Sequence, residues 1–246
     1  MIIIFKTMLI GHLLGDFYFQ SSKLAKNKIE SNISVTKHAF LYSIALLLVS
    51  WLIFSKTNYF YLSIVCLSHF IIDFCKIRIH KLNIVSDIWL YFIDQLIHIV
   101  ILFIYSYLLS SLDIINFNHW INRIENNNIL TIETLISWIL LLLVIIQPAS
   151  ITIKILLNNF QPQETTSNDV KQGIPNVGAF IGMLERILIL LMLTINEYSS
   201  IGLVITAKSV VRYKKISEDP VFSEYYLLGT LLSTIIVIIA FLMIIP

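Results

Sequence analysis

Long, continuous runs of apolar residues restrict this chain to one class of fold. Residues 42–54, 135–146 and 227–245 are mostly aliphatic or aromatic, and polar positions do not alternate with them. In lipid every backbone N–H and C=O must be bonded within the protein, so a spanning segment is either a helix or part of a closed barrel. Continuous apolarity favours helices, since barrel strands alternate. The sequence therefore predicts an all-α, polytopic membrane bundle.

Composition supports this class and excludes others. Hydrophobic residues make up 57% of the 246 positions and charged residues 13%, against about 25% charged in soluble domains. The formal net charge of +2 is too small to argue for nucleic acid as a partner. The expected partner is the lipid bilayer, and no protein partner is identified by the sequence.

Seven segments are long and apolar enough to be expected as membrane spans, and an eighth, 199–211, is short for a crossing. We expect a single membrane domain over 1–246, because neither half would shield a polar site alone. It consists of front helices within 1–157, a polar linker at 158–176 and rear helices within 177–246. The seven expected spans are 2–20, 38–54, 58–75, 87–110, 134–157, 177–196 and 224–245.

Basic residues predict the orientation of these spans. Lysines and arginines gather in 21–37, 76–81 and 208–215, which the positive-inside rule places in the cytoplasm. The loop 111–133 carries Arg123 against Asp113, Glu125 and Glu133, as expected of an outside loop. The N-terminus is then outside, the first and third helices run inward, and the fourth runs outward.

Three His/Asp pairs, each spaced by four residues, interrupt the apolar spans of the front half. Residues four apart lie on one helix face, and ionisable groups within a membrane usually face the bundle interior and serve a function. On the two inward helices the histidine comes first, and on the outward helix the aspartate does. All three aspartates are therefore expected at one depth, nearer the cytoplasm, with the histidines one turn deeper. The pairs are His12/Asp16, His69/Asp73 and Asp94/His98.

Three interpretations of these six residues stay open. As a metal site they would bind zinc, manganese or iron, with imidazole and carboxylate ligands. Without metal they would form a proton or cation path, since histidine titrates near neutral pH. The third interpretation is structural, with each pair holding helices together through hydrogen bonds.

A catalytic version of the metal site assigns further roles. Asp94 and His98 would supply the general base beside the metal, and Arg186, inside the sixth span, would orient a phosphate or carboxylate of the substrate. Gln95 is expected to point elsewhere on its helix, because adjacent positions do not share a face. His38 falls at a predicted helix end and is not assigned to the site.

Two further patterns bear on packing and on the membrane surface. Gly11/Gly15 and Gly178/Gly182 have GxxxG spacing, which favours close helix approach. The basic residues of 208–215 are interpreted as topology anchors, with contact to anionic lipid headgroups as the alternative.

Several of these segments resemble a known family. HLLGDFYFQ at 12–20, HFIID at 69–73 and DQLIH at 94–98 are similar to the bacterial membrane proteins of the domain of unknown function 3307 family. The similarity continues in GAFIGMLERILILL at 178–191, AKSVVRYKK at 207–215 and EYYLLGTLLS at 224–233. The resemblance implies a multi-pass protein of the bacterial cell (inner) membrane and no particular substrate.

The functional expectation is accordingly a metal-dependent membrane hydrolase acting near the cytoplasmic side. The alternatives are a proton- or cation-coupled transporter or channel that uses the same residues, and a non-catalytic membrane partner protein. Whether the chain is an enzyme is left open by the sequence.

Overall fold

The computed structural model describes the chain except for residues 57–58, 113–115, 122–130, 161–176 and 246. The described residues contain no β-strand, only an isolated bridge between Phe54 and Phe117. The predicted all-α class is confirmed. The helices are α1 (Ile2–Leu13), the π-helix η1 (Leu14–Tyr18), α2 (Ser22–Asn27), α3 (Asn32–Ile53), α4 (Tyr59–Lys81), α5 (Asp87–Ser111), α7 (Ile132–Leu157), the 3₁₀ turn η2 (Asn158–Phe160), α8 (Val177–Thr194), α9 (Tyr198–Val211), α10 (Tyr213–Glu218) and α11 (Pro220–Ile244).

Within the described part of the chain, six helices are long and apolar enough to cross a membrane: α3, α4, α5, α7 with η2, α8 and α11. The first predicted span is instead divided between α1 and η1, and α9 has only 14 residues. The protein is a multi-pass helical membrane bundle, as predicted.

Two helices extend beyond the apolar runs that predicted them. α3 begins at Asn32 rather than near residue 38, and α4 continues to Lys81 rather than ending near 75. Hydropathy marks the part of a helix in hydrocarbon, whereas the backbone hydrogen-bond ladder continues through polar residues. Both extensions add polar residues to helices that were expected to end earlier.

The chain divides into two compact units, Met1–Leu143 and Val144–Pro246, and the division falls within α7. The predicted linker 158–176 lies mostly outside the described residues, as do Asp113, Arg123 and Glu125 of the predicted outside loop. The single membrane domain and the predicted orientation stay predictions.

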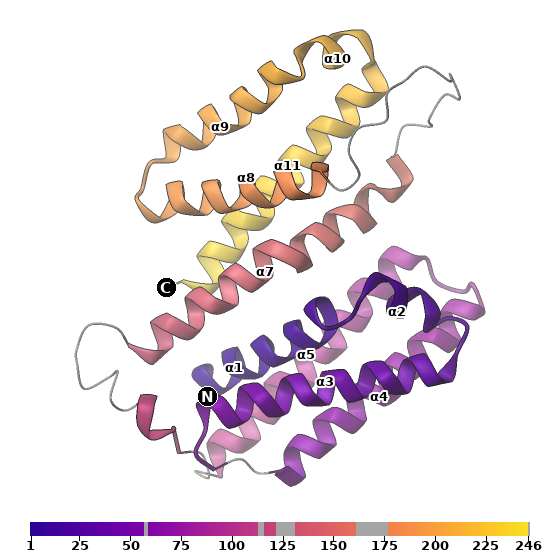
Figure 1. Cartoon of the computed structure of the whole chain (residues 1–246), viewed down its shortest axis with the longest axis vertical. Helices are drawn as coiled ribbons and strands as arrows, with labels where there is room; N and C mark the ends of the chain where they lie inside the picture. The colour runs from indigo at the N-terminus through magenta and orange to yellow at the C-terminus, as the bar shows by residue number, and fades with distance from the viewer. Residues whose placement is uncertain (57–58, 113–115, 122–130, 161–176, 246) are drawn as a thin grey trace. The chain divides into compact units, whose positions relative to one another are not determined.

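In the first unit, α1, α3, α4 and α5 form a ring of four helices, in which each helix packs against two neighbours (Figure 1). The pairs are α1 with α3, α3 with α4, α4 with α5, and α5 with α1. Polar residues at the centre of such a ring are removed from lipid on every side. The start of α7 joins this unit through Lys6, whose ammonium group donates to the Ser137 hydroxyl at 2.8 Å.

The second unit consists of α8, α9, α10, α11 and the part of α7 from Val144 onward. α8 packs against α9 and α11, and the short α10 packs against α11. α11 begins at a defined cap, where the Asp219 carboxylate accepts from the backbone N–H of Phe222 at 3.0 Å and Pro220 occupies the first turn.

Candidate metal and proton-transfer site

All six residues of the three predicted pairs lie in the first unit, and the side-chain contacts between helices are shorter than the side-chain contacts within the His12/Asp16 and Asp94/His98 pairs. His12 Nε2 is 3.9 Å from Asp16 Oδ2, and His98 Nδ1 is 3.7 Å from Asp94 Oδ1. Between helices, His69 Nδ1 is only 2.7 Å from His98 Nε2. The three pairs therefore form one cluster that joins several helices, rather than three separate contacts within single helices.

The end of the first helix places Asp16 in this cluster. Residues Leu14–Tyr18 form a π-helical turn, a feature that often occurs at functional sites. A Cβ added to Gly15 would lie 2.6 Å from Tyr42 Cδ2 and 3.1 Å from Tyr42 Cα, so only glycine allows this approach of η1 to α3. The Asp16 carboxylate consequently reaches His38 of α3, with 3.2 Å between Oδ1 and Nε2.

A chain of imidazole nitrogens crosses three helices. His38 Nε2 lies 3.1 Å from His69 Nε2, and His69 Nδ1 lies 2.7 Å from His98 Nε2. His98 Nδ1 lies 2.9 Å from the Asp94 carbonyl oxygen, which only accepts, so this nitrogen carries a proton. A neutral His98 then accepts at Nε2, and the proton in the His69–His98 bond is assigned to His69 Nδ1.

This assignment creates an electrostatic conflict at His69. If His69 is neutral with its proton on Nδ1, the Nε2 lone pair faces Asp16 Oδ1 at 3.4 Å. Two acceptors at that distance repel each other. A proton on His38 Nε2, which lies 3.1 Å from His69 Nε2 and 3.2 Å from Asp16 Oδ1, can be donated to one of these acceptors and reduces the conflict. A second proton on His69, or a cation between the two atoms, removes it.

Gln95, Tyr42 and His12 complete the polar network. The Gln95 amide nitrogen donates to Asp94 Oδ2 at 3.1 Å and to Asp16 Oδ2 at 3.4 Å, so its oxygen faces His12 Nε2 at 3.3 Å. The Tyr42 hydroxyl lies 3.3 Å from His12 Nδ1. The Tyr42 ring stacks on His69 with 3.5 Å between centroids. The expectation that Gln95 points elsewhere is wrong, because its side chain reaches back across the centre of the ring.

Two of the three aspartates form ion pairs with buried or half-buried lysines. Lys28, in the turn before α3, lies with its Nζ 2.7 Å from Asp73 Oδ2, and Lys76 Nζ lies 2.7 Å from Asp94 Oδ2. Lys28 is only 8% exposed, and this burial lowers its pKa while Asp73 opposes the change. Neither carboxylate needs another cation.

Asp16 differs from the other two aspartates. Among the described residues it forms no ion pair with a lysine or arginine, and its carboxylate lies near three histidine nitrogens and the Gln95 amide nitrogen. Three carboxylates and two ammonium groups leave one negative charge if every histidine is neutral. A buried charge is costly unless it is paired, so the site requires one more positive charge beside Asp16.

The atoms around Asp16 have the spacing of metal ligands. His38 Nε2, His69 Nε2 and Asp16 Oδ1 form a triangle with sides of 3.1, 3.2 and 3.4 Å. Tetrahedral zinc, with bonds of about 2.0–2.1 Å, separates its ligand atoms by about 3.3 Å. Ligand atoms of His12, Asp16 and His69 also lie within 4.8 Å of one another, which makes His12 a fourth candidate ligand.

Sequence reasoning missed several residues of the site. His38 was set aside because α3 was expected to begin there, whereas it lies well inside the helix and is 1% exposed. Lys76 is three residues after Asp73, on the same helix face, so a longer predicted α4 would have found it. No sequence signal indicated Lys28.

Arg186 belongs to the second unit. Its guanidinium donates to the carbonyl oxygens of Ile145 and Ile146 and to the hydroxyl of Ser150, on the turns of α7 around Pro148. Pro148 has no N–H to donate to the Val144 carbonyl, and the two carbonyls that Arg186 contacts lie on the same turn of α7. A role for Arg186 at the His/Asp site stays a prediction.

The family model described as a protein of unknown function (DUF3307) matches residues 4–126, and the chain belongs to this family. The match includes every residue of the His/Asp cluster named above and ends before the second unit. No curated protein and no solved structure matches the chain.

Proposed function

We propose that this DUF3307 protein binds a divalent transition metal in its first unit and is a metal-dependent membrane hydrolase. The observation that supports it most is the surroundings of Asp16. Its carboxylate has no lysine or arginine partner among the described residues, and it completes a triangle of ligand atoms with tetrahedral spacing. A divalent cation there would supply the missing positive charge and remove the repulsion between Asp16 and His69.

The proposed ligands differ in part from those expected from the spacing of the pairs. His38, His69 and Asp16 are the nearest set, with His12 as the fourth candidate. Asp73 and Asp94 are less suitable, because each already pairs with a lysine at 2.7 Å. Three imidazoles and one carboxylate suit zinc best, with manganese and iron as alternatives.

The remaining residues would orient the ligands. The proton on His69 Nδ1 is donated to His98, and the Asp94 carbonyl fixes the tautomer of His98. Such outer contacts set the direction and basicity of a metal-bound imidazole. In this proposal His98 and Asp94 do not bind the metal, but they orient the His69 imidazole that does. His98 is also placed to take up a proton.

A bound metal makes a coordinated water acidic enough to supply hydroxide near neutral pH. A catalytic zinc site has three protein ligands, a number that His38, His69 and Asp16 would supply; with His12 as a fourth ligand the site would be of the structural kind. The proposed setting is a bacterial cell membrane, with the site nearer its cytoplasmic side, as the charges of the basic loops predict.

Cobalt(II) titration of the purified, metal-free protein tests this proposal. Tetrahedral cobalt absorbs visible light strongly, so a single saturable site with that spectrum is expected. Asp16→Asn should weaken cobalt binding by at least about tenfold, whereas Asp73→Asn should change it little. Equal effects of the two substitutions, or no saturable site in the wild type, would refute the ligand set. Hydrolytic activity that survives complete metal removal would refute the metal-dependent reaction.

A second candidate function is proton transfer across this part of the membrane. The specific observation is the His38–His69–His98 chain, whose nitrogens lie 3.1 and 2.7 Å apart. In this case the missing positive charge is a proton shared between His69 and its neighbours. Proton flux in reconstituted vesicles that is lost in His98→Gln, in metal-free buffer, would favour this function; cobalt binding without flux would favour the first.

A further inference from the structure

A cavity in the second unit gathers positive charge that the described residues do not neutralise. It has a volume of about 500 Å³ and is lined by residues of α7, α8, α9 and α11 together with Arg212, which follows α9. Four cations line it, against one carboxylate, Glu185. Glu185 is already paired with Lys208, with 2.7 Å between Oε2 and Nζ. The cations are Lys154, Arg186, Lys208 and Arg212.

Arg186 is the deepest of these cations. It is 3% exposed, and none of the described residues pairs a carboxylate with it. Its Nε and Nη2 donate to α7, but Nη1 has no hydrogen-bond partner among the described residues. Nη1 lies on the side of Gly182, where an added Cβ would be 3.4 Å away. A buried guanidinium with free donors is suited to an anionic oxygen.

A second polar group also lacks a partner at this cavity. Ser233 is 7% exposed, and its buried hydroxyl has no hydrogen-bond partner in the part of the chain that the structure describes. It lines the same cavity as Arg186. Buried polar atoms are normally satisfied, so an unpaired donor beside an unneutralised cation indicates a ligand that accepts hydrogen bonds.

The rest of the lining is apolar. Ile151, Ile153, Leu157, Ile181 and Phe222 all face the cavity, and they lie in helices long enough to cross a membrane. A small inorganic anion would make no favourable contact with this apolar surface. A ligand with an anionic head and a hydrocarbon tail satisfies both parts, and a volume of this size is typical of ligand sites.

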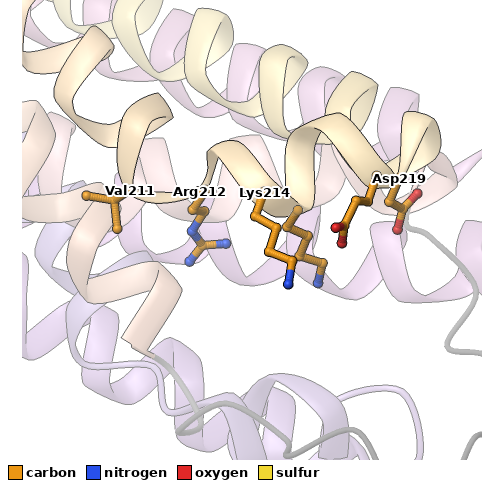
Figure 2. A pocket seen from close by; sticks show the side chains of 6 residues that line it. Val211, Arg212, Lys214 and Asp219 are labelled. Atoms are coloured by element: carbon orange, nitrogen blue, oxygen red, sulfur yellow. The ribbon is translucent and has the colours of Figure 1, made fainter.

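Basic residues continue outward from the cavity. Arg212 also lines a hollow of about 380 Å³ at the turn between α9 and α10, where three cations, Arg212, Lys214 and Lys215, face two carboxylates, Glu218 and Asp219. Figure 2 shows the side chains of Arg212 and Lys214 extending from the same side of this turn. Lys215 Nζ lies 4.2 Å from the centre of the Phe222 ring, a basic and aromatic combination common at the membrane interface.

We propose that this cavity binds a phospholipid with an anionic headgroup. Its phosphate contacts Arg186 and Arg212, and an acyl chain lies along the apolar wall near Ile151 and Phe222. The site is formed by the second unit alone and does not depend on the metal proposed for the first unit.

Lipid binding to the full chain in a neutral detergent tests the proposal, measured by native mass spectrometry with phosphatidylglycerol at a low mole fraction. Because the micelle is uncharged, general attraction to an anionic surface is absent. One phosphatidylglycerol per chain is expected, bound about fivefold or more tightly than phosphatidylcholine. Inorganic phosphate should not displace it.

Two lysines provide a matched pair of variants. Lys154 lines the cavity and Lys214 only the outer hollow, and both are exposed, so neither substitution threatens folding. Lys154→Gln should weaken phosphatidylglycerol binding about fivefold, and Lys214→Gln should leave it unchanged. A third variant, Gly178→Phe, keeps the charge but fills cavity space that is open around Gly178, and should prevent binding.

Three results would overturn the proposal. They are equal affinity for phosphatidylglycerol and phosphatidylcholine, equal effects of the two lysine substitutions, and displacement of the lipid by inorganic phosphate. The last would assign the cavity to a free anion.

Discussion

Replacing Gly15 with alanine tests how the close approach of η1 to α3 shapes the His/Asp site. The new Cβ would lie 2.6 Å from Tyr42 Cδ2 and 3.1 Å from Tyr42 Cα. Carbon atoms in contact are normally about 3.5–4.0 Å apart, so the two segments must separate by about 1 Å. The Tyr42 ring cannot simply turn aside, because its face stacks on His69 at 3.5 Å.

The expected cost follows from these contacts. Overpacking costs about 1–3 kcal/mol, and the gain in backbone rigidity from alanine returns up to about 1 kcal/mol. A net loss of about 1–2 kcal/mol lowers Tm by about 2–8 °C in a chain of this length. Because Tyr42 moves with His69, cobalt affinity should fall as well.

Thermal unfolding in detergent, followed by circular dichroism, measures this change. Gly202→Ala is the matched control, since nothing lies within 4 Å of its added Cβ and it is inside α9. The control should gain about 0.5–1 kcal/mol. A Gly15→Ala protein as stable as the control, with unchanged cobalt affinity, would refute the claim that this approach positions the site.

Further substitutions test the buried charges of each unit. Lys28→Met should cost about 3–5 kcal/mol because it leaves the Asp73 carboxylate buried without a cation. The double variant, Lys28→Met with Asp73→Asn, should recover most of this loss. Lys26→Met, at an exposed lysine, is the control and should stay within about 0.5 kcal/mol of the wild type. In denaturant titrations, a double variant no more stable than the single one would contradict the ion-pair reasoning. Arg186→Met should cost about 1–3 kcal/mol, because it removes the buried hydrogen bonds from the guanidinium to the Ile145 carbonyl and the Ser150 hydroxyl. A variant as stable as the wild type in the same titrations would contradict a structural role for these bonds.

The sequence predicted the part of the site that depends on helix periodicity. Spacing by four residues identified six polar residues, and all six lie in the first unit. The sequence could not predict which side chains of different helices contact one another. His38 was missed because apolar content, not the backbone, set the expected start of α3. Gln95 was excluded by an argument about one helix face, although its side chain is long enough to reach Asp16 across the ring.

The division of roles among the three aspartates also lies beyond the sequence. They are equivalent by spacing, and only the three-dimensional positions of Lys28 and Lys76 distinguish Asp16 from Asp73 and Asp94. The glycine pairs Gly11/Gly15 and Gly178/Gly182 also have the same spacing in the sequence but different surroundings in the structure. The first pair allows close helix contact as predicted, whereas nothing lies within 4 Å of a Cβ at Gly178 and the second pair lines a cavity.

The most direct test of the proposed metal site is elemental analysis of the protein purified in detergent without chelator. The wild type is expected to carry about one equivalent of zinc, manganese or iron per chain. His69→Ala should lose this metal, and His80→Ala, a histidine that pairs with Asp87 outside the cluster, should retain it. Wild-type protein that contains no metal, and takes up none on dialysis against each of the three ions, would contradict the proposal.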